Sequence, residues 1–104
     1  MPNANYRKGA DFERYVCRIY RHLGYFVVRS AGSHTPVDVV AIPCDDRGKD
    51  APLPHLVQCK GNRVLPQAAR MKLELLSQTH YVQPMLAYKM KGPFKGWTRC
   101  EEVV

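Results

Sequence analysis

The chain has 104 residues, of which 45% are hydrophobic and 24% are charged, a length that suits one compact domain with one core and excludes two. Lys and Arg number 16 against 9 acids, a net charge of +7. This balance favours a polyanionic partner, nucleic acid before an anionic membrane, over a basic protein that has no such partner.

The hydrophobic pattern predicts an α/β chain with the element order α-β-β-β-α-β-β. The first helix is expected from residue 6 or 7 to Leu23, with Gly24 as its C-terminal cap. Its apolar stripe is Phe12, Tyr15, Val16, Ile19, Tyr20 and Leu23, with Glu13 on the border. Strands are expected at 25–29, 37–42, 56–60, 82–90 and 97–103, and a second helix at 66–78. The loop between the second and third strands has no helical period, which predicts an antiparallel pair.

Cysteines and aromatic residues are expected to be structural. The four cysteines form no CxxC pair and no zinc-finger spacing with His. Three of them lie in apolar surroundings and are expected in or near the core, as reduced thiols of an intracellular protein. Tyr, Phe and Trp are also expected to be core residues rather than base-stacking platforms.

No targeting or membrane segment is expected. The first ten residues contain no apolar run of a signal peptide, and no stretch approaches the roughly 20 apolar residues of a membrane span. We therefore expect no membrane partner and an intracellular location, cytoplasmic or nucleoid-associated, or the host cytoplasm for a virus-encoded version.

One acid, Asp38, lies within the second predicted strand, between valines. Strand interiors contain few Asp residues, and a buried acid needs a partner or a cation. Residues i and i+2 of a strand share a face, so Gln58 and Lys60 point the same way. If the second and third strands pair, Asp38 lies beside Gln58.

This arrangement predicts a cation site. A carboxylate from Asp38 and an amide carbonyl from Gln58 are hard oxygen ligands for Mg²⁺, which Mn²⁺ is expected to replace, and the backbone carbonyl of Cys59 is a further ligand. Lys60 would orient or help deprotonate the attacking water and stabilise transition-state charge. Glu13 would complete the coordination directly or through a water. No small-molecule cofactor is expected.

A basic face is predicted on the first helix, where four arginines gather away from the apolar stripe: Arg7, Arg14, Arg18 and Arg21. With Lys8 and Arg29 nearby, a phosphate-binding role is favoured over a merely solvated face. The loop acids Asp45, Asp46 and Asp50 are expected to be solvated rather than a metal cluster.

Several segments together point to a known family: RKG at 7–9 with ER at 13–14, VVRSAGS at 27–33 with VDVVA at 37–41, QCK at 58–60, LAYK at 86–89 and GW at 96–97. In these segments the sequence resembles the archaeal-type Holliday junction resolvases, a branch of the PD-(D/E)xK nucleases. The match spans nearly the whole chain. The first two segments are highly specific as a pair, whereas the Asp and QxK elements alone are weak.

The resemblance implies a restriction-endonuclease-like fold, a mixed five-stranded sheet flanked by helices, in a single nuclease domain over residues 1–104. It implies a homodimer, Mg²⁺ dependence and paired symmetric nicks at a four-way junction, because a two-fold protein suits a pseudo-two-fold substrate. Carried over by position and completed by Gln58, the catalytic set is Glu13, Asp38, Gln58, Lys60 and Ser33. The expected DNA contacts are Arg7, Lys8, Arg14, Arg29, Ser30, Ser33 and His34.

The departure from the family pattern is Gln58, where Glu is usual. The amide carbonyl can still bind Mg²⁺, but the site loses one negative charge, which predicts weaker Mg²⁺ binding. The leading hypothesis is a structure-selective endonuclease that resolves four-way junctions. The alternatives are a related nuclease acting on other branched DNA, a non-catalytic DNA-binding module whose site has decayed at Gln58, and an unrelated basic interaction protein. Two acids near phosphate argue against a pure binding module.

Overall fold

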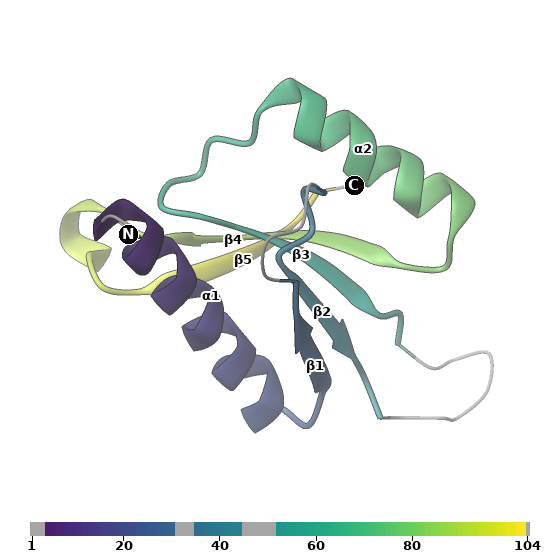
Figure 1. The fold of residues 1–104 in the computed structure, drawn as a ribbon, viewed down its shortest axis with the longest axis horizontal. Helices are drawn as coiled ribbons and strands as arrows, with labels where there is room; N and C mark the ends of the chain where they lie inside the picture. Colours follow the sequence, from purple (N-terminus) through teal and green to yellow (C-terminus); the bar gives the residue numbers. More distant parts are fainter. Residues whose placement is uncertain (1–3, 31–34, 45–51, 104) are drawn as a thin grey trace.

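The computed structural model describes residues 4–30, 35–44 and 52–103. Its elements confirm the predicted order, with ends that differ from the prediction by a few residues. They are α1 (Ala4–His22), β1 (Phe26–Arg29), β2 (Val39–Ile42), β3 (His55–Lys60), α2 (Gln67–Thr79), β4 (Gln83–Lys89), the 3-10 turn η2 (Gly92–Phe94) and β5 (Thr98–Glu102) (Figure 1). Gly24 caps α1 as expected, because its φ of +95° reverses the chain and Tyr25 N–H donates to the carbonyl of Tyr20 at 3.0 Å.

The five strands form one mixed sheet in the order β1-β2-β3-β4-β5. β2 and β3 pair antiparallel, as predicted, with Val39 opposite Val57. β3 and β4 run parallel, with α2 as the crossover between them, and β1 and β5 join at the two edges as antiparallel strands. The carboxyl ends of β3 and β4 therefore meet at one edge of the sheet, where Lys60 lies opposite Tyr88.

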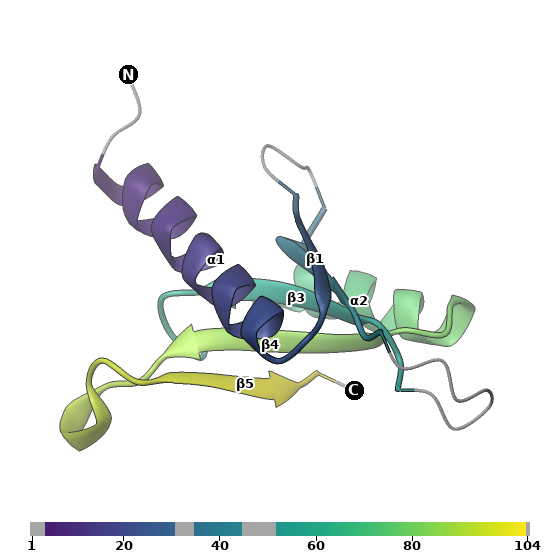
Figure 2. The ribbon, with the colours of Figure 1, turned by 90° about the horizontal axis from the view of Figure 1, so that it is seen from below.

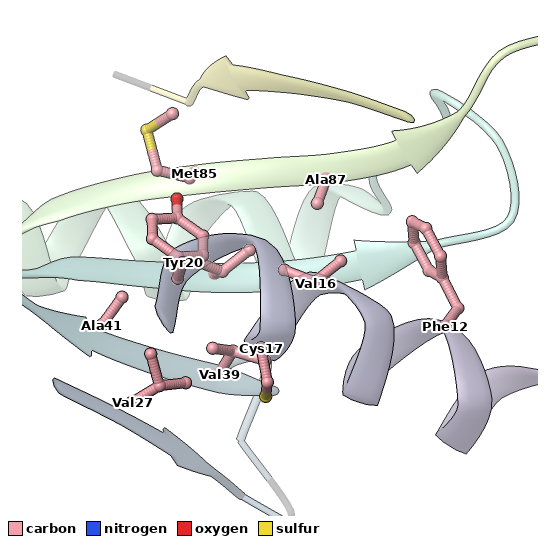
Figure 3. Close-up of a cluster of buried hydrophobic side chains, with 10 residues drawn as sticks. Phe12, Val16, Cys17, Tyr20, Val27, Val39, Ala41, Met85 and Ala87 are labelled. Atoms are coloured by element: carbon pink, nitrogen blue, oxygen red, sulfur yellow. The ribbon is translucent and has the colours of Figure 1, made fainter. Parts of the chain in front are cut away.

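α1 covers one face of the sheet. Four of its buried side chains, Phe12, Val16, Cys17 and Tyr20, pack on Val27, Val39, Ala41, Met85 and Ala87 of the strands (Figure 3). The predicted stripe was wrong at two positions, because Tyr15 and Leu23 are 42% and 67% exposed. Cys17, at 2% exposure, replaces them. The helix packs against β1, β2 and β3, so it turns its Cys17 side inward.

α2 covers the opposite face, as Figures 1 and 2 show together. It packs on β4 through Leu73, whose side chain is fully buried. β4 is buried at five consecutive residues, Pro84 to Tyr88, because helices cover both of its faces. Among the described residues, no helix has the length and apolar character to cross a membrane.

The expectation of structural cysteines and aromatics is only partly correct. Cys17 is buried and Cys59 is half-buried, whereas Cys44 and Cys100 are exposed. Phe12, Tyr20 and Tyr88 belong to the buried set. Phe26 is 65% exposed because it lies on edge strand β1 and faces away from α1, and Trp97 and Tyr81 are 68% and 90% exposed in connecting segments.

Candidate active site

Asp38 lies immediately before β2, which begins at Val39, rather than inside the strand. Continuing the strand register places it opposite Gln58. Its Oδ2 atom accepts two hydrogen bonds, from Nε2 of Gln58 at 2.9 Å and from the backbone N–H of Cys59 at 2.8 Å. The predicted proximity of Asp38 and Gln58 is thus confirmed, and the half-buried acid has partners for its charge.

Gln58 and Lys60 project from the same face at the end of β3. Gln58 is a buried polar residue with 8% exposure, and Lys60 is half-buried. The positive charge of Lys60 lowers the pKa of Asp38, so the ammonium group acts on the same carboxylate that Gln58 contacts. The end of β3 thereby presents the Gln58 amide and the Lys60 ammonium group beside the Asp38 carboxylate.

Glu13 reaches this region from α1 and forms an ion pair with Arg29 at the end of β1. Oε1 of Glu13 lies 3.1 Å from Nε of Arg29, and the two side chains are 20% and 21% exposed. The sequence had offered Glu13 no partner on its own helix, because residues four positions away are Gly9 and Cys17. The partner comes from an adjacent strand instead.

The carboxyl group of Asp38 has a pKa above its ordinary value of 3.8, and burial is the largest cause. The Cys59 N–H lowers the pKa, the charge of Glu13 raises it, and the charges of Lys60 and Arg29 lower it. Asp38, Glu13, Lys60 and Arg29 therefore influence one another and form one electrostatic unit. Burial, together with the charges of Asp38 and Glu13, raises the pKa of the Cys59 thiol far above its ordinary value, so the thiol stays neutral.

A basic groove of about 420 Å³ runs along α1 next to this unit. Arg29 belongs to both, because it pairs with Glu13 and also lines the groove. The exposed pair of Arg14 with Asp11, at 3.3 Å, lies on its wall. The groove is lined by Asp11, Arg14, Cys17, Arg18, Arg21 and Arg29. Four arginines against one acid make this surface complementary to phosphate.

The remaining expected contacts are placed in part. The Ser30 N–H donates to the carbonyl oxygen of Asp38 at 2.8 Å, and Lys8 is exposed on α1. The backbone of Arg7 is in α1, but its side chain is not described. Ser33 and His34 lie outside the described residues, as do the loop acids at 45, 46 and 50.

The donor set at Asp38 suits a hard cation. Among the residues that the structure describes, no three His, Cys, Asp or Glu side chains gather as a metal cluster. The Asp38 carboxylate supplies the oxygens here, and the Gln58 amide turns its nitrogen and Cys59 its backbone N–H toward that carboxylate. The amide oxygen of Gln58 and the carbonyl of Cys59 are the further oxygen ligands that these residues carry, and Glu13 is close enough to influence the pKa of Asp38. Oxygen ligands of this kind hold divalent cations that retain several waters.

Comparisons with known proteins identify the family of this chain. The family model described as archaeal Holliday junction resolvase (Hjc) matches residues 4–91. The structure is similar to that of Archaeoglobus fulgidus Hjc, a Holliday junction resolvase from an archaeal hyperthermophile. The TM-score is 0.65 with 23% sequence identity, over 92% of this chain and 73% of that chain. At that identity the likeness supports the fold. The search of curated proteins finds no significant match. Because the family model covers most of the chain, the chain belongs to the archaeal Holliday junction resolvase family, whose members are metal-dependent endonucleases that act on four-way DNA junctions.

Proposed function

We propose that this resolvase cuts four-way junctions by Mg²⁺-assisted phosphodiester hydrolysis at the site around Asp38. The observation that carries the proposal is the Asp38 carboxylate, which receives hydrogen bonds from Gln58 and Cys59 at the strand end that also bears Lys60. Asp38, Gln58 and the Cys59 carbonyl would hold the cation, with Glu13 completing the site directly or through a water. Mn²⁺ would replace Mg²⁺. When bound, the cation supplies Lewis-acid stabilisation of charge on the phosphate.

The chain's own residues have separate tasks in this proposal. Lys60 orients the attacking water and stabilises the negative charge that develops on the phosphate oxygens. Without a cation, Gln58 fixes the Asp38 carboxylate through its 2.9 Å hydrogen bond, and its amide would turn its oxygen to the cation when one binds. The ion pair of Glu13 and Arg29 would add the Glu13 carboxylate near the bound metal ion and the positive charge of Arg29 near the DNA. Ser33 is proposed to contact the scissile phosphate.

Affinity for the substrate would come from phosphate contacts along the basic groove. Arg14, Arg18, Arg21 and Arg29 supply it, and Arg7, Lys8, Ser30 and His34 are proposed further contacts. Base contacts would be few, so the shape of the junction would supply selectivity. We also propose that residues 1–104 form a single nuclease domain that acts inside the cell as a homodimer, because one site in each of two copies gives two symmetric nicks.

The decisive experiment gives the purified protein a synthetic four-way junction, a linear duplex and a replication fork, each with Mg²⁺, Mn²⁺ or EDTA. Paired symmetric nicks in the junction alone are expected with either cation, and none with EDTA. Asp38→Asn is the matched variant, because the Asn carbonyl can still accept from Cys59 N–H while the charge is lost. It should abolish cutting and leave junction binding intact.

Each other outcome contradicts part of the proposal. Cutting that survives Asp38→Asn would remove the site. Cutting of the fork or duplex at equal rates would indicate a nuclease for other branched DNA. Tight binding without cutting in either cation would indicate a decayed, non-catalytic module. Sedimentation that gives the mass of one chain on the junction would contradict the homodimer.

A further inference from the structure

We propose that Arg63 and Arg99 form a second phosphate-binding site, which holds the DNA backbone leading away from the scissile phosphate. Arg63 lies in the segment between β3 and α2, and Arg99 lies on β5. Neither belongs to the electrostatic unit of Asp38, Glu13, Lys60 and Arg29 or to the basic groove along α1. The inference rests on the proposed nuclease function in one respect, namely that the ligand is DNA.

The two arginines are organised by one carboxylate, that of Glu101. Nε of Arg63 lies 3.1 Å from Oε2 of Glu101, and Nε of Arg99 lies 3.1 Å from Oε1. The Tyr88 hydroxyl donates to the same Oε1 at 2.9 Å. This hydrogen bond is the largest cause of a lowered Glu101 pKa, so the carboxylate stays charged at neutral pH. Hydrogen bonds from Arg63 and Tyr88 and the ion pair with Arg99 therefore gather both guanidinium groups at one carboxylate.

The contact geometry leaves the arginines able to take a second partner. Both turn Nε toward Glu101, Arg63 in a hydrogen bond and Arg99 in an ion pair, and an arginine held at Nε keeps its terminal Nη groups for an end-on contact. The side chains of Arg63 and Arg99 are 72% and 60% exposed. Exposed ion pairs add little to stability, so stability alone gives no reason to gather two arginines on one acid. Planar guanidinium groups held in place are suited to phosphate oxygens.

The site continues directly from the end of the catalytic strand. Lys60 of β3 lies opposite Tyr88 of β4, and Tyr88 lies opposite Arg99 of β5, so the three residues share one face in a single row. With neighbouring strands about 4.8 Å apart, Arg99 stands roughly 10 Å from Lys60 across the sheet. A DNA strand with its scissile phosphate at Lys60 would pass this row within a few nucleotides.

The shape and charge of the surface agree with this path. A cavity of about 480 Å³ lies there, with four cationic side chains and one acidic side chain on its wall. These are Arg63, Lys89, Lys91 and Arg99 against Glu101, with Asn62, Tyr88 and Met90 completing the lining. An excess of positive charge beside a nuclease site fits a polyanion that extends past the site.

The test measures junction binding in EDTA across a series of salt concentrations, with single variants Arg63→Gln and Arg99→Gln. Lys72→Gln is the matched control, because it removes one exposed positive charge from α2, away from this cavity. Loss of one phosphate contact should make the negative slope of the logarithm of the binding constant against the logarithm of salt concentration shallower by about 0.9. Each arginine variant should show this reduction and bind about tenfold more weakly, the size of one charge-assisted hydrogen bond. Lys72→Gln should bind like the wild type.

A second readout locates the contact on the DNA. Single neutral methylphosphonates are placed at successive positions beside the nick. One position should weaken wild-type binding yet have no further effect on Arg99→Gln. Thermal unfolding of each variant should match the wild type. The second site would be overturned if the salt slopes of the two arginine variants equalled that of Lys72→Gln. It would also be overturned if every methylphosphonate weakened binding by Arg99→Gln as much as it weakens binding by the wild type.

The two proposals fail separately. A wild-type protein that binds junctions without cutting them would contradict the nuclease proposal, while the slopes still decide the second site. A protein that cuts junctions and shows unchanged slopes in both arginine variants would contradict the second site alone. A wild-type protein that binds no DNA would overturn both.

Discussion

Gln58→Glu restores the residue usual in the family and tests how the site holds its cation. In the structure Nε2 of Gln58 donates to Oδ2 of Asp38 at 2.9 Å. The substitution replaces that donor with a carboxylate oxygen. Without a cation two acids would face each other, whereas with a cation both would bind it. The metal-free and metal-bound proteins should therefore respond in opposite directions.

The size of the effect follows from this distance. Loss of a hydrogen bond to a charged group costs about 1.5–3 kcal/mol. Two unit charges about 4 Å apart repel by about 4 kcal/mol at an effective dielectric constant near 20. Proton uptake by the pair limits the total, since a protonated carboxyl can donate again. We expect the metal-free variant at pH 7 to lose at least about 2 kcal/mol, which lowers Tm by roughly 8 °C or more in a domain of this size.

Thermal unfolding measures the expected loss of stability in the metal-free variant, and Mg²⁺ titrations of cleavage measure the expected gain in cation binding. In EDTA the variant should melt below the wild type at pH 7 and recover at pH 5, and Mg²⁺ should restore its Tm because it binds the folded state. The Mg²⁺ concentration needed for cutting should fall. Gln78→Glu makes the same chemical change on the exposed surface of α2. It should leave the Mg²⁺ requirement unchanged and cost under about 1 kcal/mol, because its negative charge meets only the dipole at the end of α2. An unchanged Tm in EDTA, or an equal or higher Mg²⁺ requirement, would refute the reasoning.

Three further results are expected. At Mg²⁺ concentrations far below saturation, where most sites hold no cation, cutting should fall off on the acid side at a pH above 3.8, because burial raises the pKa of the Asp38 carboxyl. In EDTA the stability that this group contributes is present below pH 3.8 and lost as the pH rises through the folded pKa, and pH profiles of cutting and of unfolding measure the two effects. Leu73→Ala should cost about 2–5 kcal/mol by denaturant unfolding, whereas Leu75→Ala, at a position 58% exposed, should cost under about 0.5 kcal/mol; equal losses would contradict the packing of α2. Arg29→Gln should weaken junction binding about tenfold and move the acid limb to higher pH, because Arg29 lowers the pKa of Asp38. Arg14→Gln should leave that limb in place, and a limb that shifts equally in both would disprove the link.

The element order was predictable because it depends on local pattern. The period of the apolar residues separates helices from strands, and a loop without helical period fixes the antiparallel pairing of β2 with β3. The rotation of α1 about its axis was not predictable in this way. Tyr15 and Cys17 lie on opposite borders of the apolar stripe, and only the position of the sheet decides which is buried.

In the candidate site, too, contacts between paired strands were predictable from the sequence and contacts between other segments were not. Asp38 and Gln58 could be brought together from strand pairing alone. Glu13 could not be matched with Arg29, because that contact joins a helix to a strand. The cluster around Glu101 was missed because it depends on the register of β4 with β5, which no motif in the sequence indicates. The ionic contacts that distant segments make are thus the part that required the structure.

The Cys59 N–H has a consequence for observing the enzyme at work. In an ordinary strand ladder an amide donates to a backbone carbonyl, whose strength as an acceptor changes little. Here the acceptor is the Asp38 carboxylate, which gains or loses charge when a proton or a cation arrives. The nuclear magnetic resonance signal of that single amide, and its rate of hydrogen exchange, should therefore report the state of the carboxylate directly. The backbone of β3 thus contains a spectroscopic probe that needs neither a covalently attached label nor DNA.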